Sequence, residues 1–170
     1  TSIIAPRLGL SLSLNPVTKI NFATGKFYQT PYYWMLLNPN NESPLKHTYT
    51  DQHIIGLEYL FADDVKGTFE IYSKYYFNKP ISRANITPDP FDARLGFIDL
   101  GKGRAKGVEL FVQKKFANKW YGTCSYSHSR AEGLDLREDR NEYYPWDFDF
   151  VNTFTLVGGY KIKFRKSKWY

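Results

Sequence analysis

Three consecutive aromatic residues form the first candidate ligand site in this sequence. Tyr32, Tyr33 and Trp34 are followed directly by the apolar run 35–37. Exposed aromatic rings can stack on a ligand, but such a run can equally pack a loop against a neighbouring segment. Packing is the more common use, and these three residues remain the candidate ligand-binding residues of the chain.

Other residues with chemical potential do not form a site by their spacing. His128 alternates with Ser127 and Ser129, so in a strand it faces away from both hydroxyls, and a Ser–His nucleophile is not expected. One acidic loop could attract calcium, but it lacks the ordered spacing of a calcium loop and is better explained as a solvated segment: Asp135, Glu138, Asp139, Glu142, Asp147 and Asp149. We therefore expect no enzyme, no metal site and no cofactor.

Alternation of apolar and polar residues is the strongest structural signal in the chain. In residues 7–14 the leucines occupy every second position and Gly or Ser the positions between them, as in a strand with one apolar face. Similar stretches predict six more strands, at 20–28, 52–61, 68–77, 106–116, 120–130 and 149–162, and an eighth begins at Trp169.

The connections between these stretches are short and long in turn. Turn-forming residues fill the short links 15–19, 62–67 and 117–119, whereas the links 29–51, 78–103 and 131–148 are much longer. Loops of that length are uncommon in a compact soluble domain. Outer-membrane barrels have short periplasmic turns and long extracellular loops. The pattern therefore predicts an all-β, antiparallel up-and-down meander, seven to eight strands of a larger transmembrane β-barrel.

The two faces of the predicted strands differ in charge. Alternate positions in 8–14, 55–59, 69–75, 108–112 and 154–160 carry no Asp, Glu, Lys or Arg, as lipid contact requires. Lys114 is an exception near a strand end, where its stem can extend toward water. The opposite face is predicted to face the lumen and carries Glu58, Glu70, Lys74, Glu109 and Gln113.

Aromatic residues gather beside the short turns, as in the interfacial girdles of membrane barrels, although strand propensity alone also favours them. The formal charge of +6 could suggest nucleic-acid binding. However, basic residues concentrate near the turns at 114–119 and in 161–168, while 132–149 is mainly acidic. Solvated turns account for this separation of charge, and we expect no nucleic-acid partner.

The order and spacing of several stretches resemble the barrel of TonB-dependent outer-membrane receptors. The similarity is clearest in GKGRAKGVELFVQKKF at 101–116 and WYGTCSYSHSR at 120–130, and it extends to SIIAPRLGLSLSLNPVTKINFATGKFYQTP, HIIGLEYLF and YPWDFDFVNTFTLVGGYKI. This resemblance implies a bacterial outer-membrane location and a 22-stranded barrel closed by an N-terminal plug. It also implies import of a scarce small-molecule ligand, such as siderophore-bound iron or cobalamin, energised by the TonB complex.

The chain has too few strands for such a barrel and shows neither a plug nor a TonB box. Residues 1–170 are therefore expected to be a partial barrel domain. Its expected partners are outer-membrane lipid, the rest of its own barrel and plug, and the TonB complex through the missing N-terminal region. The alternatives are a small outer-membrane barrel acting as an adhesin or scaffold, and a soluble lipocalin-like carrier with its apolar face inward.

Overall fold

The chain folds into one antiparallel sheet in a computed structural model that describes residues 3–83, 96–136 and 142–162. The strands are β1 (Arg7–Asn15), β2 (Thr18–Gln29), β3 (Thr48–Ala62), β4 (Val65–Ser82), β5 (Phe97–Ala117), β6 (Trp120–Leu134), β7 (Tyr143–Pro145) and β8 (Asn152–Tyr160). Each strand from β1 to β6 pairs with the next, and β6 then pairs with both β7 and β8. The predicted meander is confirmed.

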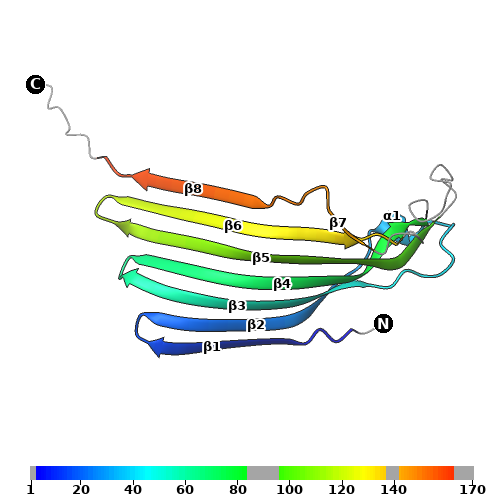
Figure 1. Ribbon diagram of the computed structural model, residues 1–170, viewed down its shortest axis with the longest axis horizontal. Helices are drawn as coiled ribbons and strands as arrows, with labels where there is room; N and C mark the ends of the chain where they lie inside the picture. The colour runs from blue at the N-terminus through cyan, green and yellow to red at the C-terminus, as the bar shows by residue number, and fades with distance from the viewer. Residues whose placement is uncertain (1–2, 84–95, 137–141, 163–170) are drawn as a thin grey trace, which may run out of the picture.

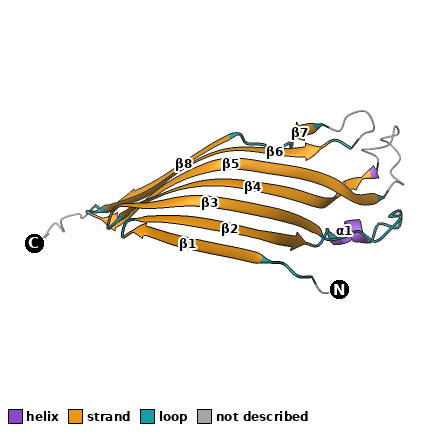
Figure 2. Ribbon diagram, turned by 60° about the horizontal axis from the view of Figure 1, so that its bottom comes forward, coloured by secondary structure: helices purple, strands orange, loops and turns teal. Residues whose placement is uncertain are grey.

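The short turns lie at one end of the sheet, and the long connections and helix α1 (Tyr33–Leu36) lie at the other (Figure 1). The strands form a single curved layer, with α1 beside the end that carries the long connections (Figure 2). Among the described residues, no helix has the length and apolar character needed to cross a membrane.

Several strands continue farther than the alternation predicts, and the three long loops are correspondingly shorter. The expected loop 29–51 ends where β3 begins at Thr48, and the expected loop 78–103 contains the last residues of β4 and the first seven of β5. In 131–148, β6 continues to Leu134 and β7 adds a short pair. Backbone hydrogen bonds to the neighbouring strand hold these extensions in place. They need no apolar face, and their sequences therefore do not alternate between apolar and polar residues. Trp169 lies outside the described residues.

The sheet has almost no core of its own. Ala105 is the only buried hydrophobic residue in the described part of the chain, while large apolar side chains are exposed along β1, β3, β5 and β8. A soluble domain of this size would bury most of these side chains. The sheet therefore depends on its surroundings to cover its apolar face.

Each tight hairpin between long strands has a two-residue turn. Val17 donates its backbone N–H to Asn15 Oδ1 at 3.0 Å, an Asx turn around Pro16. Asn118 and Lys119 have φ values of 52° and 73°, the left-handed pair of a type I′ turn, whose twist matches that of the two flanking strands. These turns set the register of the hairpins that they close.

An ion pair fastens the β3–β4 turn to a neighbouring strand. Lys114 of β5 donates a hydrogen bond to the Asp64 carboxylate in the β3–β4 turn, and Lys115 N–H donates to the Asp64 carbonyl at 2.8 Å. The hydrogen bond from Lys114 lowers the pKa of the Asp64 carboxyl below its ordinary value of 3.8. The lysine on the otherwise apolar face thus has a partner just outside the strands.

We expect this pair to make the stability of the sheet depend on pH. Because the folded pKa of Asp64 is depressed, its stabilisation is present above pH 3.8 and is lost as the pH falls toward the folded pKa. Asp64→Asn should remove that part of the acid sensitivity when urea unfolding is followed across this range. The matched control is Asp63→Asn, which removes the same charge from the same turn. Equal acid sensitivity in wild type and Asp64→Asn would contradict the assignment.

Candidate functional site

The strand register divides all residues of the sheet between two faces. Directly paired residues lie on the same face, so Leu10, Phe22, Ile55, Ile71 and Val108 form one continuous row across five strands. We call this side the outer face. The five residues predicted to face a lumen all lie on the opposite side, the inner face: Glu58, Glu70, Lys74, Glu109 and Gln113.

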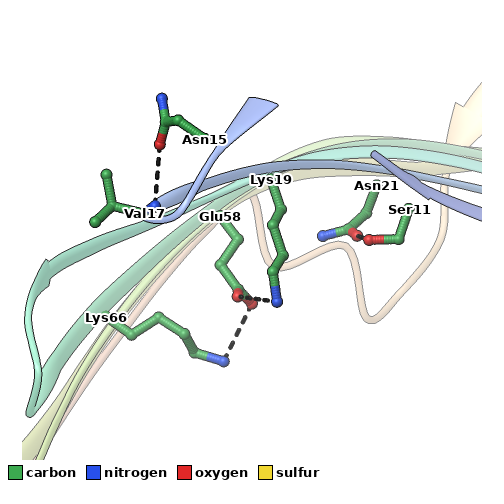
Figure 3. A network of polar contacts seen from close by, with 7 residues as sticks. All are labelled: Ser11, Asn15, Val17, Lys19, Asn21, Glu58 and Lys66. Carbon is green, nitrogen blue, oxygen red and sulfur yellow. Dashed lines mark hydrogen bonds and ion pairs between the residues drawn. The ribbon is translucent and has the colours of Figure 1, made fainter. Parts of the chain in front are cut away.

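Polar side chains of neighbouring strands contact one another on the inner face. Glu58 of β3 lies between Lys19 of β2 at 4.0 Å and Lys66 of β4 at 3.3 Å. On the adjoining pair of strands, Ser11 Oγ donates to Asn21 Oδ1 at 2.7 Å. These side chains all extend to the same side of the sheet (Figure 3). Partly exposed pairs of this kind contribute at most about 1 kcal/mol each, so their main effect is to make this face polar.

Two carboxylates oppose each other at the centre of the inner face. Glu70 of β4 and Glu109 of β5 are directly paired in the register, and neither has a cationic partner among the described residues. Like charges placed opposite one another destabilise a strand pair. Lys74, on the same face, lies over the Tyr72 ring at 4.9 Å from its centroid rather than against either carboxylate. The inner face therefore keeps unneutralised negative charge.

The outer face has an apolar section of limited height. On β5 it lies between Lys106 and Lys114 and presents Val108, Leu110 and Val112, with Leu110 48% exposed. Eight residues at about 3.3 Å each give roughly 27 Å along the strand, or about 20 Å of height at a tilt near 40°. This height is close to the apolar band of about 25 Å in membrane barrels.

Aromatic rings lie on the outer face at both ends of this section. Trp120 and Tyr160 are directly paired beside the short turns. At the other end, Tyr49 lies between Tyr28, at 5.7 Å, and Phe77, at 4.8 Å between ring centroids. From the sequence, only the aromatic residues beside the short turns are predicted. Such paired girdles are typical of barrels that span a bilayer.

An aromatic and cationic cluster lies on the inner face near the long connections. Lys79 Nζ lies 4.1 Å from the centroid of the Trp146 ring and 5.3 Å from that of Tyr76. Trp146 packs over Gly103 and Gly133, where a Cβ atom would overlap its ring. No carboxylate of the described residues pairs with Lys79. We name Tyr76, Lys79, Trp146 and the adjoining Phe148 the inner aromatic cluster.

The inner aromatic cluster is not predicted from the sequence. Lys79 and Trp146 are far apart in the sequence, and only the pairing of β4 with β5 and of β5 with β6 brings their positions together. The small residues Gly103 and Gly133 were a possible signal, because they are directly paired and leave room for a large ring. Without the register, neither glycine points to Trp146.

The predicted ligand-binding residues lie apart from that cluster. Tyr32, Tyr33 and Trp34 are 65%, 74% and 61% exposed, at and within α1. The Trp34 ring packs edge-on against Phe97 at 5.3 Å between centroids. Asn41 also holds the connection between β2 and β3. Its Nδ2 donates a hydrogen bond to the Met35 carbonyl at 2.7 Å, and its Oδ1 accepts one from the Phe97 N–H at 2.7 Å. Trp34 thus has a packing role, whereas the rings of Tyr32 and Tyr33 remain more available to contact a ligand.

The histidines and carboxylates do not assemble a reactive centre in the described residues. His128 lies on the outer face and contacts Asn152 Oδ1 at 3.0 Å, whereas Ser127 and Ser129 lie on the inner face. Within the same residues no group of three His, Cys, Asp or Glu side chains could hold a metal ion. Glu138 and Asp139 of the acidic loop lie outside the described residues.

Solved structures share this architecture. The chain superposes on the FpvAI–pyocin S2 complex with a TM-score of 0.72 and 16% sequence identity, over 94% of this chain and 21% of that one. The chain has the fold of a β-barrel segment of outer-membrane receptors. The ferripyoverdine receptor of the Pseudomonas aeruginosa outer membrane, bound to ferripyoverdine, matches 94% of the chain, with 20% of its own length covered, a TM-score of 0.71 and 16% identity.

The FrpB iron transporter from Neisseria meningitidis matches 96% of this chain and 25% of its own length, with a TM-score of 0.67 and 14% identity. The chain thus spans between a fifth and a quarter of each of these receptors. No protein-family model and no curated protein matches the sequence. At these identities, the comparison shows the fold, and it agrees with the meander described above.

A charge placed on the outer face should be far more costly than one on the inner face. Leu110 lies midway through the apolar section of β5, and Ser125 lies one residue from its partner Tyr126 but on the inner face. We expect Leu110→Arg to lower the stability of the full-length protein in lipid vesicles by about 2–4 kcal/mol. Ser125→Arg should change it little, as measured by urea unfolding. Equal losses for the two variants would contradict the assignment of the faces.

Proposed function

We propose that this chain is part of the barrel wall of a TonB-dependent receptor in the bacterial outer membrane. The receptor would import a scarce small-molecule ligand, such as siderophore-bound iron or cobalamin. The observation that carries this proposal is the combination of an apolar outer face and a polar inner face on a sheet that superposes on outer-membrane receptor barrels. The solved proteins that share the fold are described as receptors or transporters, in keeping with a transport function.

The unpaired edges of the sheet support the proposal that it is one part of a larger barrel. In the part of the chain that the structure describes, β1 pairs only with β2 and β8 only with β6, so each has a free edge. In a membrane, unpaired backbone N–H and C=O groups cost several kcal/mol each. Further strands of the same barrel would therefore pair with β1 and β8.

The inner face supports the presence of a plug inside the barrel. Glu70 and Glu109 are paired directly opposite each other, and neither forms an ion pair with a cation among the described residues. By contrast, Glu58 on the same face has two lysine partners. A cationic side chain from the plug would turn this repulsive pair into a favourable one. We infer that the plug contacts the barrel wall at this position, and that the TonB complex acts through the region that carries the plug.

The inner aromatic cluster and α1 supply side chains suited to ligand capture. Both lie at the end of the sheet that carries the long connections, which are extracellular in such barrels. Lys79 provides a cation without a carboxylate partner in the described chain, and Trp146 and Tyr76 provide flat rings. We propose that Tyr32 and Tyr33 extend this surface outward, with Trp34 holding their helix in place.

Ligand uptake tests the proposed function directly. In a strain lacking the complete gene, we expect energy-dependent uptake of a radiolabelled ferric siderophore or of cobalamin to be lost, and to return on complementation. A protonophore should abolish the restored uptake because the TonB complex depends on the proton gradient. Undiminished uptake of every tested ligand in the deletion strain, or uptake that resists the protonophore, would contradict the proposal.

The Glu70–Glu109 pair gives a prediction with opposite signs in two forms of the receptor. In a barrel expressed without its plug, Glu109→Gln should raise the unfolding midpoint because it relieves repulsion worth up to about 1 kcal/mol. In the complete receptor, the same variant should lower the midpoint because it removes a partner of the plug. Glu58→Gln, which loses partners within the sheet, should lower both. The same sign for Glu109→Gln in both forms would count against the plug contact.

A further inference from the structure

A groove of about 860 Å³ lies where the apolar section of the outer face ends toward the long connections. Three successive rows of the register form it. The first row is apolar on β4 and β5, where it includes Ile71 and Val108, and it continues with His128 on β6. The second row contains Lys106 opposite Arg130, and the third contains Arg104 opposite Glu132. The groove thus changes from apolar to cationic to ion-paired between Val108 and Arg104 of β5.

The charges of the groove do not cancel. Arg104 Nε donates to Glu132 Oε2 at 2.6 Å, and Arg130 lies 3.6 Å from the buried carboxylate of Asp149. Lys106 has no carboxylate partner among the described residues, and its nearest aromatic ring, Tyr75, is centred 5.7 Å away. Three cations therefore face two carboxylates, and one positive charge remains in the second row.

Lys106 carries this surplus charge directly opposite Arg130, whose own charge is matched by Asp149. The two cations are directly opposite each other on adjacent strands, where like charges destabilise the pair. They also lie on the membrane-facing side, inside the aromatic row of Tyr28, Tyr49 and Phe77. An anion beside Lys106 would match the remaining positive charge, and phosphate oxygens suit both its ammonium group and the neighbouring guanidinium of Arg130.

The surroundings specify an amphiphile rather than a free anion. The row on the membrane-centre side of Lys106 is apolar across five strands, so a molecule whose phosphate contacts Lys106 and Arg130 meets Val108 and Ile71 with its next atoms. The two cations are also at the height where the apolar section ends, roughly 27 Å along β5 from Lys114. At this position the cations can contact a phosphorylated headgroup while the apolar row contacts the acyl chain.

We propose that the outer face of β4, β5 and β6 binds a phosphorylated lipid of the outer leaflet. Its phosphate contacts Lys106 and Arg130, and its acyl chain lies along Val108, Ile71 and Ile55. Arg104 is held by Glu132 and stacks on Tyr143 at 3.9 Å, and it borders the headgroup on the extracellular side. This site is on the opposite side of the wall from the inner aromatic cluster.

Lipid retention by the full-length protein tests this site. The purified receptor would be exchanged into nanodiscs of phosphatidylcholine containing a small fraction of bisphosphorylated lipid A, and the lipid that remains after detergent washing would be counted by native mass spectrometry. We expect wild type to retain lipid A, and Lys106→Gln/Arg130→Gln to retain at least about tenfold less, as loss of two charge-assisted contacts implies. Lys106→Arg/Arg130→Lys should retain an intermediate amount.

Two controls separate the site from general charge effects. Lys19→Gln removes a positive charge from the inner face and should retain as much lipid A as wild type. Dephosphorylated lipid A should be lost from wild type and from the double variant alike. Folding of every variant would be verified by the heat-dependent gel shift of intact barrels. Wild-type retention by the double variant, or an equal loss in Lys19→Gln, would overturn the proposal.

Discussion

The pairing of backbone groups from strand to strand is the constraint on which this structure depends. From β1 to β6 the register is continuous through the rows of the apolar section, and its shifts fall near the ends of the strands, between Ser13 and Asn15, between Leu60 and Ala62, beyond Tyr76 and after Lys114. A one-residue slip in the middle rows would move every side chain of a strand to the other face. Because the rows stay in register, a leucine on β1 and a phenylalanine on β8 contact the same medium. The same hydrogen bonds satisfy the backbone where no water is available.

The difference between the two faces follows from this regularity and from where the regularity ends. Within the apolar section, the outer positions carry exposed apolar side chains, and the inner positions hold charges such as the Glu58 ion pairs. Beyond that section the bulges of β4 turn Lys79 toward Trp146, and the paired glycines 103 and 133 admit the indole ring. Regular pairing thus forms the sheet, and its irregular end holds the side chains that we propose for ligand recognition. The cations of the outer face mark the boundary between these two regions.

The sequence predicts the sheet well because one apolar face leaves a period of two in residues such as Leu8 to Leu14 and Val108 to Val112. It also places the five polar residues from Glu58 to Gln113 on one face, since they fall at the positions that alternate with the apolar face along each strand. The first residues of β5 were not predicted because glycine and charged residues there do not alternate with apolar ones, and pairing with β4 is what holds them. The inner aromatic cluster required the register of three strands, and the sequence of any one strand contains no sign of it.

The central claim is that alternate residues of one strand contact lipid and water. Single cysteines would be placed from Gly107 to Gln113 in a full-length protein whose native Cys124 is replaced by Ser, spin-labelled, and reconstituted in bilayers. The account predicts that collisions with oxygen dominate at 108, 110 and 112 and that collisions with a water-soluble nickel chelate dominate at 107, 109, 111 and 113. Uniform accessibility along the strand, or an alternation of opposite phase, would contradict it.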